Sequence, residues 1–326
     1  MKKVAVVTVN YNTDKDTNNL LNSLKKINRN DFQLQIIVVD NGSRTEFKLN
    51  QKSESSWKVA ALSLPKGMTP SRWTPDKIKI LRSEKNLGFA GGYNLGIKEV
   101  LNKNADYILI VNNDTIVHPE MLKNLLRTIE SDPGVGVTVP KIYFAKGHEF
   151  YKDKYKPDEL GKVIWYAGGY IDWSNIKSIH RGVDEVDQGQ YDKIESIEFA
   201  SGCCILFKKE VLEKVGLFDE RYFLYYEDAD LSERIKKAGY KIYYVPKALL
   251  IHINASSSGG PGNKLHDYFL TRNQMLFGFT YAPLRSKIAL LKQSIRLLIT
   301  GRPYQKQAVI DFYLRKFGEG TFFTQP

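Results

Sequence analysis

The feature that most constrains this chain is an alternation of short β-branched runs with helical patterns through its first 140 residues. Short runs rich in valine and isoleucine are typical of strands that a parallel sheet buries on both faces. Such runs occupy residues 4–9, 35–39, 78–81, 107–111 and 135–139. The sequence therefore predicts an α/β fold with a mostly parallel sheet and helices on both of its faces.

Further elements follow from local signals. Helices are expected over residues 13–26, 90–102, 119–130 and 227–238, and a helical pattern continues from about residue 264. Thr13 and Asp16 resemble a capping box, Pro119 suits a first helical position, and Gly239 suits a helix end. Two further strands are expected over residues 197–207 and 241–245. Residues 44–77 are expected to form a loop-rich insertion, and residues 141–195 hairpins or loops.

Composition indicates a globular protein, and we expect it to be cytoplasmic. The chain has 326 residues, of which 42% are hydrophobic, so it has enough apolar side chains for a sizeable core. No apolar run approaches the roughly 18–20 residues of a membrane-spanning helix. Residues 2–9 place two lysines before an apolar stretch too short for a secretory signal, so we expect a strand there. Cys203 and Cys204 are adjacent, which argues against a disulfide scaffold and for buried strand residues.

The net charge of +12 is concentrated near the C-terminal end. Residues 283–326 carry a net charge of +6, and residues 284–299 form an amphipathic helical pattern. The apolar stripe of this helix comprises Ile288, Leu291, Ile295 and Leu298. The basic residues elsewhere around it are Arg285, Lys292 and Arg296. The stripe either packs on the main domain, leaving a solvated basic face, or lies on an anionic membrane surface. No nucleic-acid-binding motif accompanies the charge, so nucleic acid is not an expected partner.

Polar clusters follow three of the predicted strands, at residues 8–12, 40–43 and 112–114. Ligands of open α/β sheets bind outside the carboxyl ends of the strands, so these clusters are expected to converge on one ligand. Asp40 could accept a hydrogen bond from the N–H of a base. The glycines of residues 86–94 would let backbone approach a ligand closely, although the loop matches neither GxGxxG nor a P-loop.

Three further residues are candidates for chemistry. Asp114 ends a strand and could hold a divalent cation on a diphosphate, or could merely cap the next helix. Asp228 lies in an acidic run at a helix start and could act as a base, or could simply favour the helix dipole. His252 precedes a Ser/Gly-rich segment and could contact a metal or diphosphate, or could be a structural histidine.

Together these segments resemble the family 2 glycosyltransferases, and within them the rhamnosyltransferase-like branch. The matching segments run in order through residues 7–12 (VTVNYN), 38–43 (VVDNGS), 86–97 (NLGFAGGYNLGI), 109–115 (LIVNNDT), 201–252 and 266–277 (HDYFLTRNQMLF). Their order and spacing cover about residues 4–280, which makes the combination specific although each motif alone is not.

The resemblance implies a GT-A fold. Residues 1–140 would be its nucleotide-sugar-binding half, residues 141–262 its acceptor-binding half, and residues 263–326 a helical, basic amphipathic extension. It also implies an inverting, metal-assisted transfer of a sugar, rhamnose in the branch resembled, from a nucleoside-diphosphate sugar to a hydroxyl. The acceptor would be a glycan or lipid-linked glycan of polysaccharide or cell-envelope biosynthesis. The protein would then work in the cytoplasm or peripherally on the inner face of the cell membrane.

The resemblance also assigns roles to residues. Asp228 would be the catalytic base, while Asp114 and His252 would face Mg²⁺ or Mn²⁺. The nucleotide sugar would be bound by Thr8, Asn10, Asn12, Asp40, Asn86, Gly88, Gly91, Asn94, Asn113 and Arg272. One departure concerns residues 112–114 (NND), which leave one acid where the family's DXD motif has two.

Two alternatives stay open. A sugar-1-phosphate nucleotidyltransferase can share a similar sheet, but it would need a basic glycine-rich loop after the first strand, where this chain has NYNTD. A non-catalytic homologue that only binds a sugar nucleotide is the other alternative, and the presence of Asp40, Asp114 and Asp228 argues against it.

Overall fold

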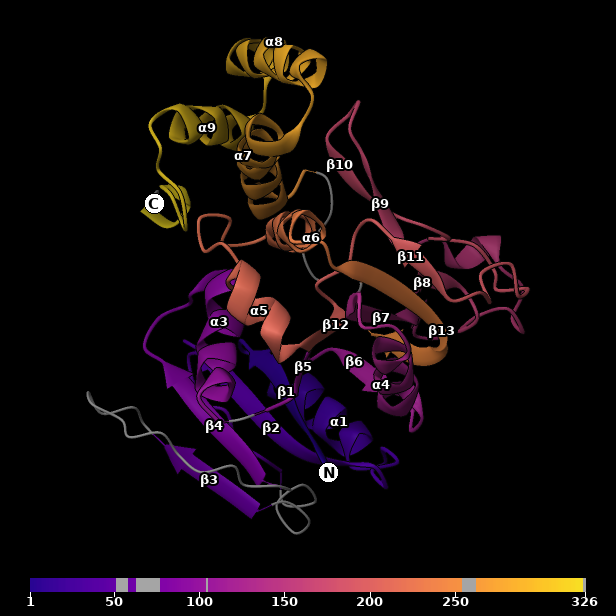
Figure 1. The fold of residues 1–326 in the computed structure, drawn as a ribbon. Helices are drawn as coiled ribbons and strands as arrows, with labels where there is room; N and C mark the ends of the chain where they lie inside the picture. The colour runs from indigo at the N-terminus through magenta and orange to yellow at the C-terminus, as the bar shows by residue number, and fades with distance from the viewer. Residues whose placement is uncertain (51–57, 63–76, 104, 254–261, 325–326) are drawn as a thin grey trace.

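A computed structural model describes residues 1–50, 58–62, 77–103, 105–253 and 262–324. Five strands form a parallel half-sheet in the order β5-β1-β2-β4-β3 (Figure 1). Their bounds are β1 (Lys2–Asn10), β2 (Phe32–Asn41), β3 (Lys58–Leu62), β4 (Lys77–Ser83) and β5 (Tyr107–Val111). The predicted strands at 4–9, 35–39, 78–81 and 107–111 are therefore confirmed.

The expectation of a strandless insertion over residues 44–77 is wrong in one respect, because β3 lies within it. Among the described residues this strand pairs with β4 alone, at the edge of the sheet. Its short sequence, KVAAL, has no alternation that would distinguish a strand from a loop. The rest of the prediction for residues 51–57 and 63–76 lies outside the described residues.

The second half of the sheet is mixed. It contains β6 (Thr115–Val117), β7 (Val135–Phe144), β8 (Ile164–Tyr166), β11 (Glu195–Ile197), β12 (Cys204–Lys208) and β13 (Lys241–His252). β12 runs antiparallel between β5 and β7, whereas β13 runs parallel to β7. Residues 141–195 form short strands and loops as predicted, including the antiparallel hairpin of β9 (Gly169–Asp172) and β10 (Lys177–His180).

Three predicted strands differ clearly in extent. The strand expected over residues 135–139 continues to Phe144 as β7, into the region expected to form hairpins or loops. The expected strand over residues 197–207 is interrupted, because residues 198–203 leave the sheet between β11 and β12. The expected strand over residues 241–245 instead continues to His252 as β13. An irregularity between Val245 and Leu249 accommodates Pro246, which cannot donate to a strand ladder. This extension places His252 in the functional region.

Helices cover the sheet at α1 (Asp14–Leu24), α3 (Gly88–Leu101), α4 (Met121–Ser131), α5 (Lys209–Val215) and α6 (Glu227–Lys237). The four predicted helices of the main domain are confirmed, and α5 was not predicted. The capping box at Thr13 is wrong, since its side chain makes no capping hydrogen bond. Glycine lets α3 lie close to the sheet: a Cβ on Gly96 would fall 2.3 Å from Cγ1 of Val7.

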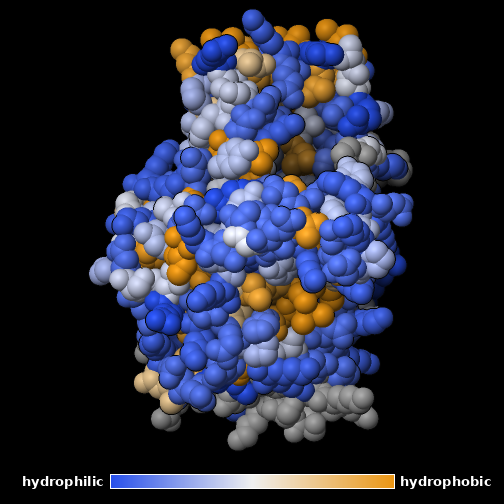
Figure 2. All heavy atoms as spheres, turned by 90° about the vertical axis from the view of Figure 1, so that its right-hand side faces the viewer, coloured by the Kyte–Doolittle hydropathy of each residue, from blue (hydrophilic) through white to orange (hydrophobic). Residues whose placement is uncertain are grey.

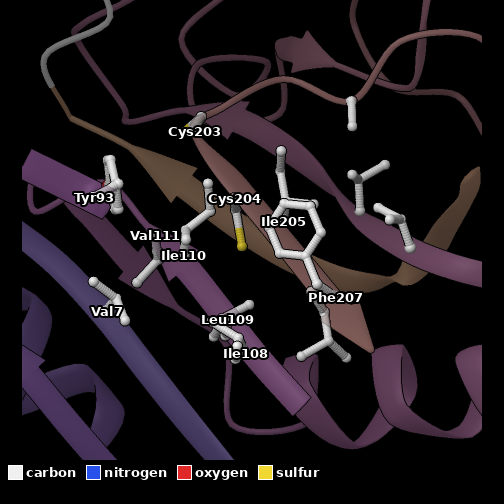
Figure 3. Close-up of a cluster of buried hydrophobic side chains, with 14 of the residues drawn as sticks. Val7, Tyr93, Ile108, Leu109, Ile110, Val111, Cys203, Cys204, Ile205 and Phe207 are labelled. Atoms are coloured by element: carbon white, nitrogen blue, oxygen red, sulfur yellow. The ribbon is translucent and has the colours of Figure 1, made fainter. Parts of the chain in front are cut away.

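Apolar side chains fill the space around β5 and β12 (Figure 3). Ile108, Leu109, Ile110 and Val111 are all completely buried. Cys204 begins β12 beside β5, pairs with Val111 in the ladder, and is also buried. Cys203 and Cys204 are both buried free thiols, as the sequence predicts, but only Cys204 lies in a strand.

Three helices end the described chain: α7 (Lys264–Tyr281), α8 (Leu284–Thr300) and α9 (Pro303–Tyr313). They pack on one another at the end of the molecule away from β1–β5, with α8 outermost (Figure 1). Figure 2 shows apolar and hydrophilic residues mixed at this end. None of the described helices combines the length and apolar character needed to cross a bilayer.

Candidate active site

The carboxyl ends of three strands meet through one hydrogen-bond network. In the parallel ladder, Asn10 of β1 lies beside Asp40 of β2. Thr17 Oγ1 donates to Asn10 Oδ1 at 2.8 Å, and Asn113 Nδ2 donates to Thr17 Oγ1 at 2.8 Å. Asn12 lies in the same region, where its Oδ1 accepts from the Arg44 N–H at 2.9 Å. The polar clusters therefore converge, as expected for the ligand edge of an open α/β sheet.

Asp40 has one carboxylate oxygen engaged and one without a hydrogen-bond partner. Its Oδ2 pairs with the guanidinium of Arg82 and accepts from the Phe47 N–H at 3.0 Å. Its Oδ1 is buried and makes no hydrogen bond among the described residues, and the same holds for Thr8 Oγ1. A buried acceptor without a partner is costly, so these two atoms are suited to accept donors from a ligand.

The glycine loop at residues 86–94 packs against other parts of the protein more than it leaves room for a ligand. Asn41 Nδ2 donates to Asn86 Oδ1 and to the Gly88 carbonyl, each at 3.0 Å. Gly88 has a φ of +71°, and a Cβ there would lie 2.4 Å from the Phe223 carbonyl oxygen. The close approach that Gly88 permits is therefore to the backbone at Phe223.

The other two predicted residues of this region also contact protein atoms. A Cβ on Gly91 would lie 2.7 Å from the Cβ of Leu87, within the same helix. Asn94 is buried, and its Nδ2 donates to the Phe218 carbonyl at 2.8 Å and to Glu220 at 2.9 Å. Asn94 thus joins α3 to the segment that precedes the acidic run.

Asp114 and His252 are brought together by the pairing of β6 with β13. His252 lies opposite Thr115 in that ladder, and its Nε2 is 3.3 Å from Asp114 Oδ1. The imidazole also packs edge-on against Trp165, with ring centroids 4.6 Å apart. Neither Asp114 Oδ1 nor His252 Nδ1 has a hydrogen-bond partner among the described residues. Each side chain of this pair therefore has one buried atom that a ligand could satisfy.

A second carboxylate lies near Asp114. Burial, and then the charge of Asp114, raise the pKa of Asp16 above its usual value. Asp16 comes from α1, so sequence spacing did not connect it with residues 112–114. Within the described ranges, however, no cluster of three or more His, Cys, Asp or Glu side chains is placed to hold a metal ion.

The acidic run places Asp228 at the start of α6. Its Oδ2 accepts from the Gly202 N–H and its Oδ1 from the Ala229 N–H, both at 2.9 Å. Burial raises the pKa of Asp228 to about 6, although these backbone donors favour the ionised form. Burial and the charge of Asp228 raise the pKa of the neighbouring Glu227 well above its usual value. Of the two neighbours, Asp228 is the one that ionises near neutral pH.

A bent aromatic segment leads into α6. Phe223, Tyr225 and Tyr226 all have positive φ angles, between 63° and 70°, which non-glycine residues adopt only at a cost in free energy. Asn273 of α7 compensates, because its Nδ2 donates to the carbonyls of Tyr222, Leu224 and Tyr225 at 2.7, 2.7 and 2.9 Å.

Arg272 holds the same segment from α7. Its side chain is completely buried, and its Nη2 donates to the carbonyls of Arg221 and Tyr222 at 3.2 and 3.1 Å. Its Nε donates to Asn273 Oδ1 at 3.1 Å, which orients the amide toward the bend. The structure therefore places Arg272 among protein atoms behind the acidic run.

A cavity of about 620 Å³ opens over Asp228. Glu227, His252 and Asn112 also line it, so the Asp228 carboxylate and the His252 imidazole face one space. The aromatic side chains of Trp165 and Phe199 line it as well. On its other side the cavity reaches α8 and α9 through Gln293, Leu297, Arg302 and Gln305. It therefore has room for a ligand that spans several groups.

The model of the family described as "Glycosyl transferase family 2" matches residues 5–216, more than half of the chain. The chain belongs to this family. Its relatives include the N-acetylglucosaminyl-diphospho-decaprenol L-rhamnosyltransferase of Mycobacterium tuberculosis, 27% identical over 56% of this chain and 61% of that protein. The dTDP-rhamnosyl transferase RfbF of Shigella flexneri is 25% identical over 76% of this chain and 68% of the relative. The predicted resemblance to rhamnosyltransferases is thus confirmed.

Solved structures agree on the fold. GalNAc-T7 with UDP, GalNAc and Mn²⁺ superposes with a TM-score of 0.57 at 17% identity, over 89% of this chain and 54% of that one. Staphylococcus aureus TarS 1–349 gives a TM-score of 0.53 at 14% identity, over 96% and 79%. At such identities the likeness concerns the fold alone, and it confirms the predicted GT-A architecture.

Several residues at this site were missed by reasoning from the sequence. Arg82 and Asp16 come from elements distant in sequence from the carboxylates they affect. Gly202 lies in a segment expected to be continuous strand, and Asn273 is one asparagine among others in a helical pattern. Asn273 could have been found from the sequence because it is adjacent to Arg272, which was already a candidate. No sequence signal pointed to a role for Arg82, Asp16 or Gly202 at this site.

We predict that Asn273→Ala lowers the free energy of unfolding by about 2–3 kcal/mol, because buried carbonyls in a bent segment lose their donor. Urea unfolding followed by circular dichroism measures this change. Thr280→Val is the matched control, since it removes one hydrogen bond to Leu276 within the same helix and should cost under about 1 kcal/mol. Equal losses in the two variants would contradict a special role for Asn273.

Proposed function

We propose that this protein is an inverting glycosyltransferase that moves a sugar from a nucleoside-diphosphate sugar to an acceptor hydroxyl. The observation that carries the proposal is Asp228: a carboxylate with a pKa of about 6, fixed by two backbone donors, facing a cavity that His252 also lines. A base with a pKa just below neutral is ionised at working pH and still accepts a proton effectively. Family membership supports the reaction class, and this geometry supports Asp228 as the base.

The donor would bind along the carboxyl edge of β1, β2 and β5. Asp40 Oδ1 and Thr8 Oγ1 are buried acceptors that a base N–H and a ribose or water donor would satisfy. Asn10, Asn12 and Asn113 would line the same pocket, and Arg82 would hold the Asp40 carboxylate in place. We propose indirect roles for Asn86, Gly88, Gly91 and Asn94, which shape the loop, and for Arg272, which holds the bend.

A divalent cation, Mg²⁺ or Mn²⁺, would lie beside Asp114 and His252. The Asp114 carboxylate would offer an oxygen ligand and the His252 imidazole a nitrogen ligand, and diphosphate oxygens of the donor would complete the coordination. Such a cation would neutralise charge on the leaving diphosphate. Asp16 would add negative charge nearby, which offsets the single acid of residues 112–114.

The transfer is a single displacement. The acceptor oxygen attacks the anomeric carbon from the face opposite the diphosphate, and its proton passes to Asp228. The bond from the anomeric carbon to the diphosphate oxygen breaks, and its electron pair leaves with the nucleoside diphosphate. Because one displacement occurs without a covalent sugar–enzyme intermediate, the anomeric configuration inverts, unlike in a double-displacement mechanism.

The relatives guide the choice of substrates. Two of them are named for rhamnosyl transfer, one to an N-acetylglucosaminyl-diphospho-decaprenol and one from a dTDP-linked donor. We accordingly propose a dTDP- or similarly linked rhamnose donor and a lipid-linked glycan acceptor, in polysaccharide or cell-envelope biosynthesis at the inner membrane face. Residues 1–140 would bind the donor, residues 141–262 the acceptor, and residues 263–326 would complete the acceptor side.

The first test is nucleoside-diphosphate release from a panel of sugar nucleotides with Mn²⁺ or Mg²⁺ and a lipid-diphosphate glycan acceptor. We expect release from one donor, and a loss of about 10²–10⁴-fold in kcat for Asp228→Asn, which removes the base. Asp153→Asn, an exposed acid in the acceptor half, should retain full activity. Undiminished turnover by Asp228→Asn would reject this residue as the base.

The pH profile of kcat/KM should report the ionisation of Asp228. Burial raises its pKa to about 6, and the base works only when ionised. Activity should therefore be level above about pH 7 and fall about tenfold per pH unit well below pH 6. A profile that stays flat down to pH 5 would contradict the assignment.

Asp114→Ala should abolish the turnover that depends on added Mn²⁺, because the carboxylate ligand is lost. Activity assays after EDTA treatment and metal titration measure this effect, with the exposed Asp158→Ala as control. If Asp114→Ala kept the metal dependence of the wild type, the ligand would have to lie elsewhere.

A further inference from the structure

Helix α8 exposes the residues that a surface helix normally buries. The residues it turns toward its neighbours are mostly small: Ser286, Leu290 and Ser294, with exposed fractions of 9%, 2% and 1%. Its outward residues are large and apolar, and we call them the α8 apolar face: Leu284, Ile288, Leu291, Ile295, Leu298 and Ile299. Their exposed fractions run from 39% to 73%. The sequence-based alternative in which this stripe packs on the main domain is therefore wrong.

Specific contacts fix this orientation. Ser294 Oγ lies 2.8 Å from the Tyr313 hydroxyl of α9. Leu290 packs at Gly278 of α7, where an added Cβ would fall 2.7 Å from its Cδ2. Rotating α8 to bury its apolar face would break both contacts. It would also place isoleucine side chains where the distance between α8 and its neighbours fits serine. The exposed face is thus a consequence of packing.

Basic residues flank the apolar face along its whole length. At 100° per residue, Arg285, Lys292 and Arg296 follow one edge, and Lys287 lies on the other. The sequence of α8 contains no acidic residue. In the part of the chain that the structure describes, none of these four cations pairs with a carboxylate. Their charge therefore remains available to an external anionic surface.

We infer that α8 docks on an anionic lipid surface, with its axis parallel to the bilayer. The apolar face would enter the boundary between headgroups and acyl chains while the flanking cations contact lipid phosphates. A second copy of the chain fits less well, because a symmetric contact would bring four cations against four others. The basic charge around the α8 apolar face thus favours an anionic membrane over a second copy of the chain as its partner.

Docking through α8 would also fix how the cavity is oriented relative to the membrane. Gln293 and Leu297 of α8 line the same cavity as Asp228, on the inner side of the helix. A membrane against the outer side of α8 would therefore lie next to the α8–α9 end of the cavity. An acceptor anchored in that membrane would extend its sugar toward Asp228. This step rests on the proposed function, whereas docking itself does not.

The test is co-sedimentation of the full chain with vesicles of phosphatidylcholine alone or with 30% phosphatidylglycerol. We expect binding only to the anionic vesicles, weakened at least tenfold when NaCl rises from 50 to 500 mM. Ile288→Ser with Ile295→Ser should reduce binding at least tenfold. Lys292→Gln with Arg296→Gln should do the same, since each cation near an anionic surface contributes roughly fivefold. The matched control is Lys193→Gln with Ile194→Ser, an exposed basic–apolar pair elsewhere on the protein.

The outcomes separate this inference from the proposed function. No binding of the wild type to anionic vesicles, or equal binding by the α8 variants, overturns docking. So does a lipid-free dimer that these variants dissociate in sedimentation-velocity experiments. Nucleotide-sugar binding in solution should be unchanged in the α8 variants, since none of these residues lines the cavity. If docking holds while no sugar nucleotide binds, the proposed function fails alone, and the reverse result removes docking alone.

Discussion

The bend that precedes α6 is the constraint on which the functional region depends. Phe223, Tyr225 and Tyr226 occupy the left-handed backbone region, and the amide of Asn273 holds their segment by its carbonyls. The same bend is hydrogen-bonded to the glycine loop, because the Phe89 N–H donates to the Phe223 carbonyl at 2.7 Å. It also sets the point at which α6 starts and hence the position of Asp228. A few hydrogen bonds thus join the donor-side loop, the proposed base and the C-terminal helices.

This arrangement explains how adjacent acids can have different roles. Glu227 and Asp228 are neighbours in sequence, and burial raises the pKa of both. Only Asp228 accepts hydrogen bonds from both Gly202 and Ala229, and these donors favour its ionised form. Across the cavity, the Asp114–His252 pair offers unsatisfied atoms to a positively charged partner. In the proposed mechanism, the proton acceptor and the cation would therefore occupy separate positions.

The C-terminal helices contact the functional region on two sides. α7 supplies Arg272 and Asn273 behind the bend, while the inner side of α8 closes part of the cavity. The outer side of α8 is apolar and basic, and its orientation follows from the serine-lined packing against its neighbours. One short stretch of chain thus connects the geometry around Asp228 with a surface suited to lipid.

The sequence by itself determined four of the five strands of the parallel half-sheet, the helices between them and the polar residues that end three of these strands, because these depend on local periodicity and chain direction. It also determined the family, through the order and spacing of its motifs. Only the tertiary structure decided that Arg82 reaches Asp40, that Asp16 lies near Asp114 and that residues 198–203 leave the sheet to bring Gly202 to Asp228. It also decided which face of α8 is exposed, since periodicity defines an apolar stripe but not the neighbour that covers it. Contacts between residues distant in sequence carry no local signal, and packing alone sets them.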